Sequence, residues 1–196
     1  MSSPTENQPP RISEYPVHPL ILKRWSPRAM SGEPLSTEEI STLFEAGRWA
    51  PSTANEQEWK FLYARQNSKS WNRFFNLLEK GNQAWCKNAA VLVLIIGRKC
   101  FQKTGKPNPV HAFDCGNAFQ NIALQATEMN LVVHPMAGFN YEQARVELQV
   151  PETHDVIAMF AAGRHGDPNQ LQDSYKVREF PSTRLPLSEI VTEIES

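Results

Sequence analysis

The sequence lacks a long apolar run and a secretory leader. Its longest apolar stretch, residues 89–96, is much shorter than the roughly 20 apolar residues that a membrane-spanning helix needs. Residues 1–10 contain neither the basic start nor the apolar segment of a secretory signal peptide. We therefore expect no membrane partner and no export signal.

Cysteine is also scarce. The three cysteines, Cys86, Cys100 and Cys115, are odd in number and show no Cys-x-x-Cys spacing, so a disulfide framework is not expected. Chains without disulfides are typical of reducing compartments. The cysteine content therefore favours a cytoplasmic protein.

Charge of one sign and the common nucleotide or protease motifs are absent as well. Lys and Arg total 20 and Asp and Glu total 21, for a net charge of −1, whereas nucleic-acid-binding domains usually carry a basic excess. No GxGxxG follows a predicted strand, and the chain has no GxxxxGK[ST], HExxH or GxSxG. These absences leave nucleic acid, a Rossmann dinucleotide site, a P-loop, a zinc protease and a serine hydrolase without support.

What the chain does have is the length of one domain and many prolines. A chain of 196 residues is within the usual size of a single domain. Pro4, Pro9, Pro10 and Pro16 lie among polar residues near the N-terminus, which predicts a flexible tail over residues 1–16. The single domain is then expected over residues 17–196.

Hydrophobic spacing predicts helices alternating with strands. Helices are expected at about 18–24, 36–49, 69–80, 110–129 and 140–148, strands at about 59–64, 90–97, 131–133 and 156–162, and a last helix or edge segment at 188–195. Ser36 with Glu39 is a capping-box signature, and Asn130 can end the longest helix in the left-handed conformation. Such interleaving implies a sheet covered on both faces.

Four polar clusters lie between these elements. The first, at residues 24–28, brings Arg24 and Arg28 close to a helix end, where guanidiniums could hold a phosphate. The others are the hydroxyl- and amide-rich residues 50–59, the small-residue stretch 134–139, and Arg184 between two prolines at 181–186. Small residues leave backbone N–H groups approachable by a ligand.

Two other chemistries can be read from the same sequence. His111, Asp114 and Cys115 would share one helical face, and all three residue types bind zinc. Cys115 or Cys86 could also pair with His134 as a nucleophile. The simpler interpretation is an acidic residue near a helix start and buried, inert cysteines.

The clusters, taken in order, resemble the FMN-dependent nitroreductase family across about residues 18–190. Residues 24–30 resemble its Arg-x-Ser-x-Arg-x-Phe element, residues 50–59 its Ala-Pro-Ser-x-x-Asn-x-Gln-Pro-Trp element, and residues 114–121 its central helix. Residues 135–139 and 184–186 complete the set. Each match alone is weak, but five in the same order are specific.

The resemblance implies a fold and a cofactor. The fold is α+β: a three-layer α-β-α sandwich with a mixed central sheet, which forms a homodimer through the long central helix and a C-terminal segment that wraps around the partner subunit. FMN lies at the interface, and NAD(P)H binds transiently as the electron donor.

The resemblance also assigns residues to FMN. Arg24, Ser26 and Arg184 would hold the phosphate, and Arg28 and Asn82 the pyrimidine edge of the flavin. The other chain would contribute Pro51, Ser52, Thr53 and Asn55. Pro135, Met136, Ala137 and Gly138 would pack under the ring, with the backbone of Ala137 and Gly138 near N5. No side chain is implied to be catalytic, because the cofactor carries the chemistry, and no metal is implied.

The chain departs from the family pattern at three positions. Ser182 stands where many members have Lys, which would weaken the phosphate site. Glu58 replaces the common Pro before Trp59. Trp25 replaces a frequent Arg or His, at a position where the backbone is expected to contact the cofactor.

The resulting hypothesis is an NAD(P)H-dependent FMN oxidoreductase that passes electron pairs to an organic acceptor such as a nitroaromatic or a quinone. A reductive dehalogenase, an enal or semialdehyde reductase, and a flavin-binding protein without turnover are the alternatives. Residues 66–88 and 99–112 are the candidate lid segments over the flavin. A metal-dependent hydrolase is the most distant alternative.

Overall fold

The computed structural model describes residues 11–194. The helices are α1 (Pro19–Lys23), α2 (Thr37–Arg48), α3 (Trp71–Phe75), α4 (Lys80–Cys86), α5 (His111–Glu128), α6 (Tyr141–Glu147), α7 (Asp173–Lys176) and α8 (Leu187–Ile190), with short 3-10 turns η1 (Thr53–Asn55) and η2 (Pro168–Gln170). The strands are β1 (Trp59–Arg65), β2 (Val91–Arg98), β3 (Leu131–Met136) and β4 (His154–Arg164). Residues 1–10 of the predicted tail lie outside the described residues.

The strands form one sheet in the order β1-β2-β4-β3. Every adjacent pair is antiparallel, so the expectation of a mixed sheet is wrong for the strands of the described chain. The connection from β2 through α5 to β3 makes these two strands parallel to each other. They are not neighbours, however, because β4 lies between them and runs in the opposite direction.

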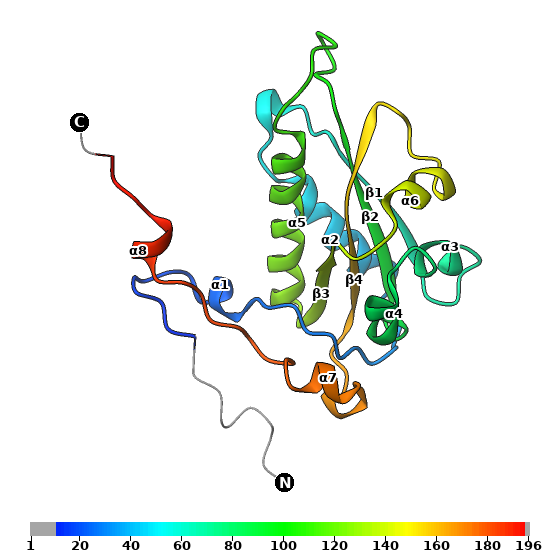
Figure 1. The fold of residues 1–196 in the computed structure, drawn as a ribbon, viewed down its shortest axis with the longest axis vertical. Helices are drawn as coiled ribbons and strands as arrows, with labels where there is room; N and C mark the ends of the chain where they lie inside the picture. The colour runs from blue at the N-terminus through cyan, green and yellow to red at the C-terminus, as the bar shows by residue number, and fades with distance from the viewer. Residues whose placement is uncertain (1–10, 195–196) are drawn as a thin grey trace.

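Helices cover both faces of this sheet, which confirms the three-layer α-β-α sandwich (Figure 1). β2 is buried along nearly its whole length, as expected of a central strand. Its alternate residues Leu92, Leu94 and Ile96 pack with residues of α3, α4 and α6. Val91, Val93 and Ile95 pack with α2 and α5 on the opposite face. The strand pleat thus divides the core into two layers.

The helix-capping residues that the sequence predicts cap their helices in the structure. The Ser36 side chain accepts from the Glu39 amide at 3.0 Å, and the Glu39 carboxylate accepts from the Ser36 amide at 2.7 Å, so α2 begins with a complete capping box. Asn130 follows α5 with a φ of 55°. Gly97 of β2 allows α5 to approach closely, because a Cβ there would lie 2.9 Å from Cys115 Sγ.

The helix predicted over residues 69–80 is wrong in its extent. The segment forms α3, then a turn, and then α4. At the turn, Leu78 forms a β-bridge with Phe139, and the Glu79 amide donates to the carbonyl oxygen of Gly138 at 3.0 Å. This contact with the loop after β3 replaces the helical hydrogen bonds that the spacing predicted.

The C-terminal residues leave the body of the domain. After α7 the chain runs away from the sheet as an extended arm that carries α8 near its end (Figure 1). Apolar side chains along this arm are exposed: Leu185, Leu187, Ile190, Val191 and Ile194. No helix in residues 11–194 combines the length and apolarity required to cross a membrane.

Candidate functional site

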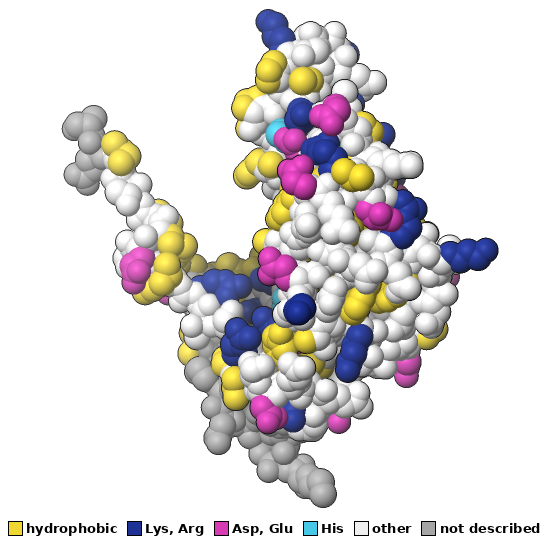
Figure 2. All heavy atoms as spheres, turned by 45° about the vertical axis from the view of Figure 1, so that its right-hand side comes forward, with side chains coloured by type: hydrophobic (Ala, Val, Ile, Leu, Met, Phe, Trp, Pro, Cys, Tyr) yellow, Lys and Arg dark blue, Asp and Glu magenta, His cyan; other side chains and the backbone are white. Residues whose placement is uncertain are grey.

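Arginines from both ends of the chain meet at one cavity of about 260 Å³. Its lining residues are Arg11, Arg24, Trp25, Ser26, Arg28, His134, Phe180, Ser182 and Arg184. Figure 2 shows Lys and Arg side chains gathered where the C-terminal arm leaves the body of the domain. The structure therefore brings together the sequence-predicted residues 24–28, 182 and 184.

Three of these guanidiniums have no carboxylate partner in the part of the chain that the structure describes. Within residues 11–194, Arg11, Arg24 and Arg184 form no ion pair. Burial and the like charge of Arg184 lower the pKa of Arg24. Because arginine stays charged under ordinary conditions, the cavity concentrates positive charge, and a bound anion would relieve the repulsion.

Arg28 is held differently from these three. Glu179 Oε1 accepts from the backbone amides of Arg28 at 2.7 Å and Ala29 at 2.8 Å, and Glu179 Oε2 lies 3.9 Å from Arg28 Nη1. The Arg28 guanidinium also lies 5.9 Å from the centre of the Tyr175 ring. The Tyr175 hydroxyl donates to the Gly81 carbonyl oxygen at 2.7 Å, which links Arg28 to the residue before Asn82.

Asn82 meets the loop that follows β3. Its Nδ2 donates to the Gly138 carbonyl oxygen at 2.9 Å. A Cβ on residue 138 would lie 2.9 Å from the same nitrogen, so a larger residue there would displace the Asn82 side chain. Within residues 11–194, the amides of Ala137 and Gly138 donate no hydrogen bond outside the sheet ladder. This loop therefore offers unused N–H groups, as its small residues suggested.

The remaining predicted residues, Pro51, Ser52, Thr53 and Asn55, lie elsewhere. The Thr53 amide donates to Asp114 Oδ2 at 2.8 Å, which anchors this loop at the first turns of α5 (Figure 1). The arginine cavity lies near the other end of that helix, where Trp25 and Pro27 line a space with Thr127 and Asn130. An 18-residue helix is about 27 Å long, so one chain does not bring these two groups together.

A buried carboxyl pair supports the Thr53 loop. Glu58, which is 2% exposed, accepts from Asn108 Nδ2 at 2.7 Å through Oε1. Asp114, 3% exposed, lies within hydrogen-bonding reach of Glu58. Burial, together with the negative charge of Asp114, raises the pKa of Glu58. A proton held on Glu58 would let one carboxyl donate to the other.

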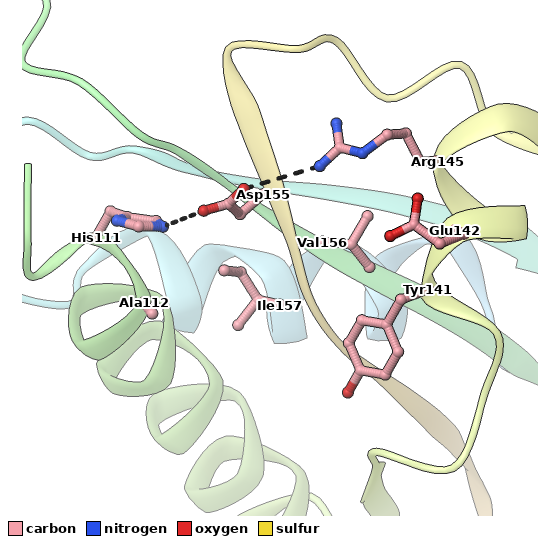
Figure 3. Close-up of a pocket in the computed structure, with 8 residues that line it drawn as sticks. All are labelled: His111, Ala112, Tyr141, Glu142, Arg145, Asp155, Val156 and Ile157. Atoms are coloured by element: carbon pink, nitrogen blue, oxygen red, sulfur yellow. Dashed lines mark hydrogen bonds and ion pairs between the residues drawn. The ribbon is translucent and has the colours of Figure 1, made fainter. Parts of the chain in front are cut away.

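A larger cavity of about 460 Å³ lies between α5, β4 and α6 (Figure 3). It contains none of the sequence-predicted flavin residues. His111 Nε2 lies 3.0 Å from Asp155 Oδ2, and Arg145 Nη2 lies 3.8 Å from Asp155 Oδ1. Arg145, the one arginine among the described residues that line this cavity, is therefore paired within the protein, and Glu142 adds a negative charge there. The arginine cavity, where Arg11, Arg24 and Arg184 form no ion pair within residues 11–194, is the stronger candidate for binding an anion.

The alternative chemistries gain no support. No group of three His, Cys, Asp or Glu side chains in residues 11–194 is arranged to hold a metal ion. Burial raises the pKa of both thiols, that of Cys115 to about 12. His134 Nδ1 bonds with the Pro27 carbonyl oxygen at 3.0 Å, and burial lowers the His134 pKa to about 4.

Sequence reasoning missed Arg11, Tyr175 and Glu179. Arg11 fell in the predicted tail, and the other two in residues 163–186, which read as a polar loop. No spacing or motif distinguishes these residues from ordinary surface positions. They contact the site only because the two ends of the chain fold over the same end of the sheet.

The sequence and the fold of the chain are similar to those of known proteins. The sequence model described as the Nitroreductase family matches residues 21–164. A protein of Archaeoglobus fulgidus named as an NADH dehydrogenase/NAD(P)H nitroreductase is 27% identical over 167 residues, which cover 80% of this chain and 88% of that protein.

Solved structures are similar over nearly the whole chain. An oxidoreductase containing FMN is 41% identical with a TM-score of 0.90, covering 93% of this chain and 94% of the other. A nitroreductase in complex with FMN from Desulfovibrio desulfuricans is 26% identical with a TM-score of 0.72, covering 94% of this chain and 99% of the other.

Proposed function

Because the chain belongs to the nitroreductase family, we propose that it is an FMN-dependent oxidoreductase that passes electron pairs from NAD(P)H to an organic acceptor such as a nitroaromatic or a quinone. The observation that carries this proposal is the arginine cavity, which His134 also lines and in which Arg11, Arg24 and Arg184 form no ion pair within residues 11–194. A phosphate monoester carries about −1.5 to −2 charges at neutral pH, so the FMN phosphate fits these residues.

The roles of the chain's own residues follow from their placement. Arg24, Ser26 and Arg184 would hold the phosphate. Arg28, fixed through its backbone by Glu179, would place a positive charge at the edge of the flavin ring, where preorganised charge favours the reduced cofactor. The FMN itself supplies the two-electron chemistry when it is bound.

The loop after β3 would complete the half of the site on this chain. Asn82 keeps its side-chain oxygen available after Nδ2 bonds to Gly138. The free amides of Ala137 and Gly138 would donate hydrogen bonds to the flavin ring near N5, and Pro135 and Met136 would pack beneath it. These contacts orient the cofactor and need no titrating side chain.

We further propose that the functional unit is a homodimer. Residues 51–55 and the arginine cavity lie at opposite ends of α5, so an antiparallel pair of chains would bring the loop of one to the cavity of the other. The exposed apolar residues of the C-terminal arm give the arm a reason to pack on a partner. Light scattering of the purified protein should report twice the mass of the chain.

The visible spectrum of the purified protein tests the cofactor. We expect a flavin spectrum, retained or restored on adding FMN, that bleaches during anaerobic titration with NADH or NADPH. Protein that stays colourless after FMN is added would refute the proposal. Arg184→Ala should weaken FMN binding by about 1–3 kcal/mol, the range for a hydrogen bond to a charged group, and an unchanged affinity would remove Arg184 from the site.

The acceptor is found with pre-reduced enzyme. Rapid reoxidation by nitroaromatics or quinones supports the proposal as stated. Rapid reoxidation by a halogenated aromatic or an enal instead would identify one of the alternative reductases. Slow reoxidation by every compound would indicate a flavin-binding protein without turnover.

A further inference from the structure

The first described residues of the chain contribute to the arginine cavity. Arg11 Nη1 donates to the carbonyl oxygens of Leu22 at 2.9 Å and Arg24 at 2.6 Å. Its Nε donates to the Ser182 carbonyl oxygen at 3.0 Å. Carbonyls from two distant segments therefore fix the Arg11 guanidinium, although the sequence placed this residue in a flexible tail.

These contacts orient the Arg11 guanidinium but leave its charge unbalanced. Carbonyl oxygens are dipoles and carry no net charge, and no carboxylate within residues 11–194 forms an ion pair with Arg11. Burial and the like charges of Arg184 and Arg24 lower the Arg11 pKa. Its Nη2 has no hydrogen-bond partner in the described chain, so the N–H groups on this side of the guanidinium remain available to an acceptor.

We propose that Arg11 is a third phosphate-binding guanidinium of this site, which joins Arg24 and Arg184 on the cofactor's phosphate. The inference rests on the proposed FMN function. It also explains how the site keeps its positive charge although Ser182 is uncharged: the Arg11 side chain bonds to the backbone of residue 182 and places its own charge there.

The same N-terminal segment also holds the C-terminal arm. Glu14 Oε1 accepts from the Leu187 amide at 2.8 Å, close to the start of α8. Through Arg11 and Glu14, the segment 11–14 thus contacts both Ser182 and Leu187. Arg11 could therefore act merely as a link that positions Arg184, and the experiment must distinguish this structural role from direct contact with phosphate.

A comparison of FMN with riboflavin, which lacks the phosphate, makes this distinction. Flavin-free wild type, Arg11→Ala and Arg11→Lys are titrated with each flavin by fluorescence quenching. Arg73→Ala is the matched control, since Arg73 pairs with Glu147 and does not line the arginine cavity. Thermal unfolding of each variant checks that it is folded.

We expect Arg11→Ala to raise the Kd for FMN about 10-fold or more and to leave the Kd for riboflavin within about twofold, since a charged hydrogen bond is lost only in the first case. Arg11→Lys keeps the positive charge but lacks the planar set of guanidinium N–H donors, so it should recover part of the affinity for FMN. The salt dependence of FMN binding should also fall in Arg11→Ala.

Two outcomes would overturn the inference while leaving the proposed function intact. An equal loss for FMN and riboflavin would make Arg11 a structural link only, and an unchanged Kd for FMN would remove it from the site. Wild-type protein that binds neither flavin would instead refute the proposed function, and this inference with it.

Discussion

The buried carboxyl of Glu58 makes a strong prediction about stability. Glu58 Oε1 accepts from Asn108, but Oε2 is buried with no hydrogen-bond partner in the described chain. Asp114 Oδ2 accepts from the Thr53 amide. Burial, together with the negative charge of Asp114, raises the pKa of Glu58, so the folded protein holds a proton on Glu58 to higher pH than the unfolded chain does.

The pH dependence follows from where this proton is held. Unfolded Glu58 releases it near the ordinary pKa of about 4.3, whereas the folded protein keeps it to higher pH. Between these two values the folded state binds more protons than the unfolded state, so the free energy of unfolding falls as pH rises. Above the raised pKa, Glu58 is ionised in both states, and its destabilising effect on the fold no longer changes with pH.

Glu58→Gln should remove this cost. The Gln oxygen can still accept from Asn108, while its NH₂ group takes the place of Oε2 and donates to Asp114 without a titrating proton. At pH 7 the gain should be about 1.4 kcal/mol for each unit by which folding raises the pKa of Glu58. In a domain of this size each kcal/mol shifts the unfolding temperature by about 2–4 °C.

Thermal unfolding at several pH values between 4 and 8 measures the effect. We expect Glu58→Gln to be more stable than wild type at pH 7–8 and the difference to shrink toward pH 4, where most of Glu58 is protonated in both states. Glu152→Gln, at an exposed position, should change neither curve. A less stable Glu58→Gln at pH 7, or a gain equal at pH 4 and pH 7, would refute the reasoning.

Three further predictions concern the scaffold. Ser36→Ala removes the bond to the Glu39 amide and should lower the free energy of unfolding by about 1 kcal/mol in urea titration. Gly97→Ala places a Cβ 2.9 Å from Cys115 Sγ and should cost about 1–3 kcal/mol by the same measurement. Because burial keeps the pKa of His134 at about 4, its contribution to stability should be lost as pH falls from about 6.5 to 4, by up to about 3 kcal/mol, and His134→Gln should flatten the curve there.

The sequence predicts best what short-range patterns determine. The capping box of α2, the apolar run of β2 and the uninterrupted length of α5 are each encoded within one element, and all three are confirmed. Sheet order is not encoded in this way, since β2 pairs with β4 although β3 lies between them in the sequence. The interruption between α3 and α4 has the same origin, because it depends on a bond from Glu79 to Gly138.

The residues of the candidate site also fall into those that a short sequence motif identifies and those that it does not. Arg24, Arg28 and Arg184 lie within recognisable motifs, so the sequence could select them. Glu179 has no such pattern, yet its carboxylate, which is 2% exposed, accepts hydrogen bonds from the backbone amides of Arg28 and Ala29. Its importance depends on a segment that reads as a polar loop and folds back against residues 28–29.

The net charge of this protein does not show how its charges are distributed. A total of −1 means that the chain has no overall basic excess, but positive charges can still gather at one place. Arg11, Arg24 and Arg184 lie in segments at the two ends of the chain, and all three line one cavity without an ion-pair partner in residues 11–194. Repulsion among these like charges destabilises the protein without ligand, and a bound anion would remove this repulsion. The cavity is therefore better explained by binding of a phosphate-bearing ligand than by a contribution to the fold.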